Sequence, residues 1–285
     1  MGQSWYPGHM AKALTGLRQS MRLVDVMIEI LDARAPRCTA NPQFALAAGN
    51  KPRLIVLTKA DLADPAATKA WMGRFKQEGV RAVLANCQNG SGVSAAIAAA
   101  ESVAADAHGT GDHSEVALER RIHRRFRSVV VGIPNVGKSS FINQAAGRAG
   151  AKTGDRPGVT RGPQWIVVGR DLELLDTPGI MPPRVDDPST WFVLGCIACI
   201  SDTQYDVEEV AASLAGRLVE SGPVQWRERY GMPPELTDPG LILQHVARVR
   251  KCVLPGGGED TARAADLFIR DFRSGRLGRI TLDLP

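Results

Sequence analysis

The sequence is poor in aromatic residues and in cysteine, and none of its apolar stretches is extended. Aromatic side chains make up 5% of the 285 residues, and five cysteines are present. No apolar stretch approaches the roughly 18 residues that a membrane-spanning helix needs, and the first residues lack the apolar core of a secretory signal. With 44% hydrophobic and 23% charged residues, the composition is typical of a globular chain. We therefore expect a cytoplasmic protein that does not enter a membrane.

Two of the cysteines, Cys196 and Cys199, form a single CxxC inside the apolar stretch WFVLGCIACI. A structural zinc site needs four ligands, and no second Cys/His pair with suitable spacing is present in the sequence. We therefore interpret the pair as part of a hydrophobic core. The cysteines are expected to be reduced, and no metal is expected beyond what a nucleotide brings.

The net charge of +5 is modest, but the arginines are clustered. One cluster lies at 119–127, and a second comprises Arg270, Arg273, Arg276 and Arg279. Arginines spaced in this way can bind phosphates along a nucleic-acid backbone. A solvated helix surface would have the same composition, so the sequence leaves both interpretations open.

Before residue 184, short apolar runs alternate with helical segments, which is typical of a parallel sheet covered by helices. Strands are expected at 24–33, 53–59, 81–87, 127–133, 164–169 and 172–177, helices at 66–78 and 138–147, and a loop at 106–114. Beyond residue 184, Val207, Val210, Leu214 and Leu218 fall on one helical stripe, and further helices are expected at 237–252 and 259–275. We therefore expect an α/β domain at 1–184 followed by a small all-α domain at 185–285.

A phosphate-binding loop is predicted at 132–139, where GIPNVGKS matches G-x-x-x-x-G-K-[ST]. The loop follows an expected strand and precedes an expected helix, which is the context that such a loop requires. Its backbone N–H groups would surround a β-phosphate, and the start of the helix would face the same anion. Lys138 would neutralise the β- and γ-phosphates, and Ser139 would offer its hydroxyl to Mg²⁺.

Two further elements of a nucleotide site follow downstream. DTPG at 176–179 comes directly after an expected strand, so Asp176 would hold a magnesium-bound water and the N–H of Gly179 would sense a γ-phosphate. Between the two motifs lies PGVTRG, in which Thr160 is placed to bind both Mg²⁺ and the γ-phosphate. An ordinary turn threonine is the alternative for Thr160.

The base-reading element lies upstream of the phosphate loop. TKAD at 58–61 ends an expected strand, and Asp61 can accept hydrogen bonds from the N1–H and the amino group of guanine, while Lys59 covers the base. Adenine lacks that donor pair, so the carboxylate would reject it. NCQNGSG at 86–92 follows the next strand and can contact the guanine O6. The base-reading elements therefore precede the phosphate-binding ones, an order that a circular permutation produces without changing the site.

With these motifs the sequence resembles the circularly permuted GTPases that assist assembly of the large ribosomal subunit. The resemblance covers nearly the whole chain and includes WYPGHMAKA (5–13), DARAP (32–36), RPGVTRGPQW (156–165), DTPGIMPPR (176–184) and GRLGRITLD (275–283). It implies a permuted P-loop GTPase domain with a mostly parallel sheet and a helical C-terminal domain. It also implies GTP and GDP as ligands, slow hydrolysis stimulated by the maturing subunit, and binding of a monomer to 23S-type rRNA and ribosomal proteins.

Several positions depart from an ordinary GTPase. Ile180 stands where many GTPases have a glutamine that orients water, and we consider His9 as its replacement, with a structural turn or an RNA contact as alternatives. Asn135 is of the type that serves as a K⁺ ligand, or it is a turn residue. Thr58 replaces the usual asparagine, so it keeps a hydroxyl but loses the amide that ties neighbouring loops together, which predicts a modest affinity for guanine. Cys87 replaces a usual serine.

The candidate site follows from these assignments. The residues expected to bind nucleotide are Thr58, Lys59, Ala60, Asp61, Asn86, Cys87, Asn135, Val136, Gly137, Lys138, Ser139, Ser140, Thr160 and Gly179. The catalytic candidates are His9, Lys138, Thr160 and Gly179, and the metal ligands are Ser139, Thr160 and Asp176 for Mg²⁺ and Asn135 for K⁺. A non-catalytic GTP-sensing RNA-binding module and a P-loop kinase are the alternative functions. We also hypothesise that a change at Gly179 on γ-phosphate binding repositions the helical domain.

Overall fold

One six-stranded sheet organises the amino-terminal part of the chain. The computed structural model describes residues 3–4, 8–109, 125–148, 165–182, 184–185 and 187–285. The strands are β2 (Val26–Asp32), β3 (Arg53–Thr58), β4 (Arg81–Leu84), β5 (Phe126–Val131), β6 (Trp165–Val168) and β7 (Leu172–Asp176), in the order β4-β3-β2-β5-β7-β6. All neighbours are parallel except the β6–β7 pair. The six expected strands and the mostly parallel sheet are confirmed.

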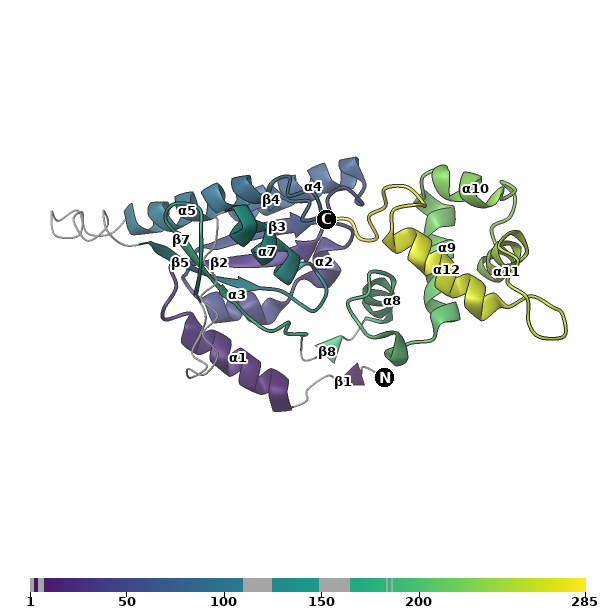
Figure 1. Ribbon diagram of the computed structural model, residues 1–285, viewed down its shortest axis with the longest axis horizontal. Helices are drawn as coiled ribbons and strands as arrows, with labels where there is room; N and C mark the ends of the chain where they lie inside the picture. The colour runs from purple at the N-terminus through teal and green to yellow at the C-terminus, as the bar shows by residue number, and fades with distance from the viewer. Residues whose placement is uncertain (1–2, 5–7, 110–124, 149–164, 183, 186) are drawn as a thin grey trace.

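Helices cover both faces of this sheet (Figure 1). The covering helices are α1 (Gly8–Ser20), α3 (Pro42–Ala48), α4 (Pro65–Gln77), α5 (Val93–Gly109) and α7 (Lys138–Arg148). Because successive strand residues point to opposite faces, Ile28 packs in the cluster that includes α5 and α7, whereas Met27 packs with α1 and α3. The loop expected at 106–114 is wrong over 106–109, because α5 continues through Gly109; the remainder of that range lies outside the described residues.

Four helices begin with the same local arrangement. An Asp or Asn side chain accepts a hydrogen bond from a backbone N–H of the first turn, and proline follows it at the first helical position. These caps are Asn41 of α3, Asp64 of α4, Asp187 of α8 and Asp238 of α11. The starts of these helices are thus specified by sequence-local chemistry.

The remainder of the chain is helical. It contains α8 (Pro188–Cys196), the short 3-10 helix η1 (Asp202–Gln204), α9 (Val207–Ser221), α10 (Gln225–Tyr230), α11 (Pro239–Val249) and α12 (Thr261–Arg273). The expected stripe on α9 is confirmed, since Val210, Leu214 and Leu218 are buried and the half-buried Val207 packs against the same core. Cys196 and Cys199 are also buried and belong to the core, as expected, and burial raises the pKa of each thiol to about 12. The boundary at residue 184 stays a prediction.

The order in which the chain visits the strands reflects the circular permutation. The chain runs from the edge strand β4 through α5 to the central strand β5, so the direction of strand addition reverses between β2 and β5. Ligands of open α/β sheets bind outside the carboxyl ends of strands at such a point. The carboxyl end of β2 leads into DARAP, with the short helix α2 (Pro36–Thr39), and that of β5 leads into the phosphate loop.

The two ends of the chain return toward this region. The short strands β1 (Gln3–Ser4) and β8 (Arg184–Val185) pair antiparallel, which joins the opening segment to the segment after DTPG. At the other end, the yellow segment after α12 leaves the helices and runs back to the sheet beside α2 and α4 (Figure 1). Within the described residues, no helix combines the length and apolarity needed to cross a membrane.

Candidate functional site

The phosphate loop has the expected strand-loop-helix context, since β5 ends at Val131 and α7 begins at Lys138. Gly137 has φ 104°, a left-handed value that favours glycine. The side chain of Lys138 is buried, and its Nζ donates to the carbonyl oxygen of Ile133 at 3.0 Å. Burial lowers the pKa of Lys138, while the nearby Asp176 opposes this shift. The ammonium is thus folded over the loop, where an anionic phosphate would stabilise its charge.

The DTPG segment lies directly against the phosphate loop. A Cβ atom on Gly179 would come within 2.9 Å of the backbone nitrogen of Pro134, so a side chain would not fit there. The N–H of Ile180 donates to the carbonyl oxygen of Gly132 at 3.3 Å. Asp176 ends β7 with an exposed side chain, and partial desolvation raises its pKa, with Lys138 acting against this. The residues therefore meet as the motif spacing predicted, while Thr160 lies outside the described residues.

Ile180 cannot orient water in this arrangement. Its side chain is 3% exposed and packs in the core cluster that contains Leu17 and Phe44. Its carbonyl oxygen accepts a hydrogen bond of 2.9 Å from the amide of Asn41. His9 lies in α1, but its side chain is outside the described part of the structure. The β1–β8 pair brings Ser4 opposite Arg184, so the strand β1 lies beside the segment that follows DTPG.

The base-reading loop is fastened to the phosphate loop. Lys59 has φ 54°, and its Nζ donates to the carbonyl oxygen of Asn135 at 3.0 Å. The Thr58 hydroxyl lies 2.5 Å from the carbonyl oxygen of Val136 and 3.0 Å from that of Leu31, and its one proton serves one of them at a time. The hydroxyl that threonine retains therefore links the two loops in the place of the lost amide. The modest affinity for guanine stays a prediction.

The second base-reading loop joins the first. The Asn86 side-chain oxygen accepts from the backbone N–H of Gln88 at 2.8 Å and of Asn89 at 3.3 Å, which folds the loop around it. Burial raises the pKa of the Cys87 thiol to about 11, and the carboxylate of Asp61 adds to this shift. The Asp61 carboxylate is thus close enough to act electrostatically on the Cys87 thiol. The Asp61 side chain is exposed at the rim of these loops.

A buried ion network contacts the base-reading loop through Lys59 and was not identified from the sequence. Asp32 and Arg34 are 0% and 2% exposed, and their bidentate contact measures 3.0 Å from Nε to Oδ1 and 2.8 Å from Nη2 to Oδ2. Lys59 Nζ lies 2.8 Å from Asp32 Oδ2. Burial alone would raise the pKa of Asp32, but the charges of Arg34 and Lys59 overcome it and hold the pKa far below its ordinary value. The sequence feature that could have indicated this ion pair is the D-x-R spacing of Asp32 and Arg34 in DARAP, at the end of a strand.

Asn135 connects the phosphate loop to the helical part. Its φ is 61°, and its amide nitrogen donates to the carbonyl oxygen of Ala198 at 2.7 Å. The amide oxygen is the atom that a K⁺ ion would need, and an oxygen donor suits that ion. Ser139 and Ser140 are exposed in the first turn of α7, so the Ser139 hydroxyl is accessible to a hard cation such as Mg²⁺.

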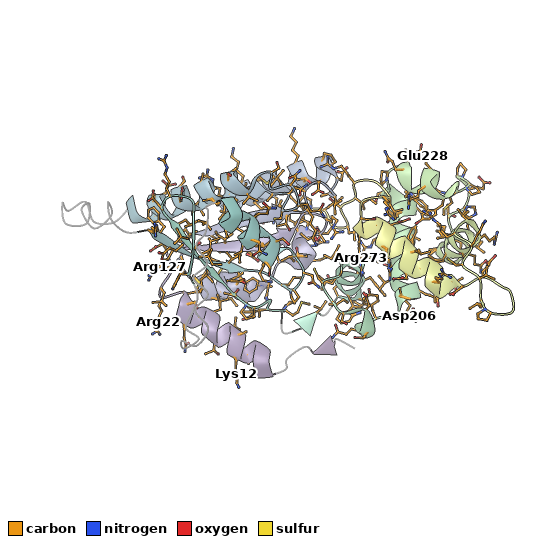
Figure 2. All side chains as sticks on the ribbon, viewed as in Figure 1. Lys12, Arg22, Arg127, Asp206, Glu228 and Arg273 are labelled. Carbon is orange, nitrogen blue, oxygen red and sulfur yellow. The ribbon has the colours of Figure 1, made fainter. Side chains whose placement is uncertain are left out.

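Two arginines of the carboxyl-terminal cluster, Arg273 and Arg279, bond to distant parts of the protein, whereas Arg270 and Arg276 are 68% and 62% exposed. Arg273, which extends from α12 toward α8 (Figure 2), donates to the carbonyl oxygens of Cys196 and Gly195. Arg276 contacts Asp271, and Arg270 pairs with Asp266 on the same helix. Arg279 donates to the carbonyl oxygens of Ala60 and Ala63. Arg273 and Arg279 link distant segments of the chain. Neither interpretation of the cluster, as a nucleic-acid surface or as a solvated helix surface, therefore applies to these two residues.

The other cluster is described only in part. Residues 119–124 lie outside the described residues. Arg127 Nε lies 3.1 Å from Glu173 Oε2, and its guanidinium lies 4.7 Å from the ring centroid of Trp165. Arg125 is farther from Glu173, at 4.0 Å. This end of the cluster therefore packs on the β6–β7 hairpin.

Comparisons with known proteins cover both the sheet and the helical part. A family model described as "50S ribosome-binding GTPase" matches residues 127–209. The chain is 36% identical over 281 residues to ribosome biogenesis GTPase A of Priestia megaterium, covering 99% of this chain and 96% of that protein. It is 37% identical over 281 residues to the protein of that name in Bacillus cereus, covering 99% and 93%. The GDP-bound structure of YlqF from T. maritima matches with a TM-score of 0.64 and 25% identity, over 95% of this chain and 99% of that one.

Proposed function

This chain belongs to the ribosome biogenesis GTPase A family and is a GTPase of ribosome assembly, and we propose that it acts on the maturing large (50S) subunit. In this proposal it binds 23S-type rRNA and ribosomal proteins as a monomer during late assembly, and the subunit stimulates hydrolysis. The observation that carries the proposal is the fastening of the base-reading loop to the phosphate loop, from Lys59 to Asn135 and from Thr58 to Val136. Family membership gives no support to the P-loop kinase or the non-catalytic alternative.

Each end of the nucleotide has its own set of residues in this proposal. Asp61 accepts hydrogen bonds from the N1–H and the amino group of guanine, and the stem of Lys59 covers the ring. Ala60, Asn86 and Cys87 complete the base pocket. At the other end, the backbone from Asn135 to Ser140 surrounds the β-phosphate, and Lys138 leaves the Ile133 carbonyl to neutralise the phosphates. The lowered pKa of Lys138 reflects a desolvated ammonium that an anion would stabilise.

We assign the metal ligands and the catalytic groups to the γ-phosphate end. The hydroxyls of Ser139 and Thr160 and the carboxylate of Asp176 would form an oxygen donor set of the kind that Mg²⁺ prefers. Bound Mg²⁺ supplies charge neutralisation at the phosphate oxygens. We assign the γ-phosphate contact to the N–H of Gly179, the orientation of water to His9, and an additional K⁺ contact to the side-chain oxygen of Asn135. Because Ile180 is buried, intrinsic hydrolysis is expected to be slow.

The helical part offers a basic surface for RNA. Arg229, Arg250 and Arg276 converge from separate segments on the single carboxylate of Asp271, at 2.5, 3.1 and 3.1 Å. Three guanidinium groups against one carboxylate leave an excess of positive charge, and the Arg276 side chain is 62% exposed. Such preorganised guanidinium groups suit the phosphates of an RNA backbone. Binding through them is expected to weaken as the salt concentration rises.

Co-sedimentation with separated ribosomal subunits tests the proposal. The protein is incubated with large or small subunits in the presence of GDP or a non-hydrolysable GTP analogue. We expect binding to the large subunit that depends on the analogue, and a single-turnover rate of GTP hydrolysis that rises when large subunits are added. Binding restricted to the small subunit would refute the assignment of the partner, and binding that ATP displaces as well as GTP would refute the base specificity.

A further inference from the structure

The base-reading loop depends on the carboxyl-terminal segment for much of its backbone hydrogen bonding. Arg279 donates from Nε to the carbonyl oxygen of Ala63 at 2.8 Å and from Nη2 to that of Ala60 at 2.9 Å. The N–H of Ile280 donates to the carbonyl oxygen of Leu62 at 2.9 Å. Bonds from these two residues thus reach three carbonyl groups on both sides of Asp61, the residue assigned to guanine.

A threonine completes the same contact. The hydroxyl of Thr281 accepts a hydrogen bond from the N–H of Asp64 at 3.1 Å, at the start of α4. The turn before this segment also lies close, because a Cβ atom on Gly275 would come within 2.7 Å of a methyl group of Leu62. Residues 279–281, which we name the tail clamp, therefore bond the backbone of the loop from Ala60 to Asp64.

The loop has a local reason to need such support. Lys59 adopts φ 54°, a left-handed conformation that costs a non-glycine residue on the order of 1 kcal/mol and persists where the surroundings fix it. Inside the loop, the N–H of Leu62 donates to the carbonyl oxygen of Lys59, while the contact from the N–H of Ala60 to Ala85 is long, at 3.5 Å. The loop's own bonds are thus few around the residue whose carboxylate must face the base.

The tail clamp is itself firmly anchored. Leu282 donates its N–H to the carbonyl oxygen of Arg34, and its own carbonyl accepts from Arg217 on α9 at 3.0 Å. Asp283 accepts from the N–H of Cys38 at 2.8 Å and, through its carbonyl, from the indole of Trp71 at 3.0 Å. Ile280 and Leu282 are buried. The two residues that follow the clamp therefore tie it to the sheet and to the helical part.

We propose that the tail clamp is a positioning element that sets the Asp61 carboxylate for guanine, so that base affinity and base selectivity depend on Arg279 and Thr281. The proposal rests on the proposed reading of guanine by Asp61. In this proposal neither Arg279 nor Thr281 contacts the nucleotide. Their loss would let the loop leave the base-reading conformation and would leave the phosphate contacts and Lys138 unchanged.

The test compares GDP with IDP, which keeps the N1–H and O6 of guanine but lacks the amino group that Asp61 also accepts from. Kd values are measured by titration calorimetry for the wild-type chain, R279A, T281V and the control R74A, whose exposed arginine pairs with Glu78. Since a lost bond to a charged donor costs on the order of a factor of ten, we expect R279A to bind GDP about tenfold more weakly. We also expect a reduced preference for GDP over IDP and an unchanged kcat at saturating GTP. T281V removes one acceptor and should give a smaller change in the same direction.

Two outcomes separate this inference from the function on which it rests. If D61N retains the GDP/IDP preference of the wild type, the assignment of Asp61 to guanine is wrong. If D61N loses that preference while R279A and T281V keep it, the tail clamp is only structural and its positioning role is wrong. A fall in thermal midpoint with an unchanged GDP/IDP ratio would likewise contradict the positioning role. If R279A does not fold, the GDP/IDP preference of the isosteric variant T281V tests the positioning role instead.

Discussion

Replacing Asp32 by asparagine tests the ion network that supports the base-reading loop. Asp32 is fully buried and accepts two bonds from the Arg34 guanidinium, at 3.0 and 2.8 Å, one from the Arg34 backbone N–H, at 3.0 Å, and one from Lys59, at 2.8 Å. D32N keeps the volume of the side chain, so no cavity forms, but it removes the charge that faces a guanidinium only 2% exposed. Breaking a buried pair in this way costs about 3–5 kcal/mol, because the remaining charge is left without compensation.

Chemical unfolding measures this cost against a matched exposed pair. Glu78 pairs with Arg74 at 2.6 Å, with the two side chains 47% and 55% exposed, so E78Q is expected to change the free energy of unfolding by less than about 1 kcal/mol. The double variant D32N/R34M removes the buried guanidinium as well and should be more stable than D32N alone. A cost for D32N no larger than that for E78Q, or a double variant less stable than D32N, would refute the argument from buried charge.

The same residue makes an acid-dependent contribution. Its folded-state pKa is depressed from the ordinary value of 3.8, so the unfolded state takes up the proton first as the pH falls. The stabilisation from Asp32 is therefore present above about pH 4 and is lost progressively below it. D32N lacks this contribution, so the difference in stability between the wild type and D32N should shrink as the pH drops below about 4. A difference that stays constant down to about pH 2 would contradict this linkage.

Three further substitutions address the loops. T58V removes the hydroxyl beside the Val136 carbonyl, and urea unfolding should give a loss of about 1–2 kcal/mol together with weaker GDP binding; unchanged values would contradict the link between loops. G179A places a Cβ 2.9 Å from the Pro134 nitrogen in the phosphate loop, so calorimetry should find binding of a GTP analogue reduced about tenfold or more, with a smaller loss for GDP, which lacks the γ-phosphate contact. N135A should abolish any excess of the GTPase rate in KCl over that in NaCl, and an excess that survives would exclude the amide as the K⁺ ligand.

The parts of the site that the sequence predicted are local. A run of β-branched and leucine residues at 54–57 ends at Thr58, and the strand β3 ends there as well. The same holds for β5 before the phosphate loop and β7 before DTPG. In each case the apolar run specifies the strand and the motif specifies the loop that follows it. Since carboxyl ends of parallel strands gather at one edge, the meeting of these loops also follows from the sequence.

The parts that the sequence did not predict depend on long-range partners. Arg279 and Ala60 are 219 positions apart, and Arg273 and Cys196 are 77 apart. An arginine that donates to a buried carbonyl and one that contacts RNA have the same local sequence, so spacing cannot distinguish them. Asp32 is different, because the register of β2 and β3 sets it opposite Thr58. The pairing of β2 with β3 could therefore have predicted the contact of Asp32 with Lys59, the residue that follows Thr58.

These long-range contacts constrain how the helical part can respond to the nucleotide. At the phosphate end, a side-chain bond joins it to the loop, from Asn135 to the Ala198 carbonyl, and Val136 of the loop shares a buried core cluster with Cys199. At the base end the tail clamp forms several backbone bonds from Ala60 to Asp64 beside the buried Leu282. Both junctions thus combine hydrogen bonds with buried apolar side chains. A change at Gly179 would therefore reposition the helical part only by disrupting apolar contacts as well as hydrogen bonds.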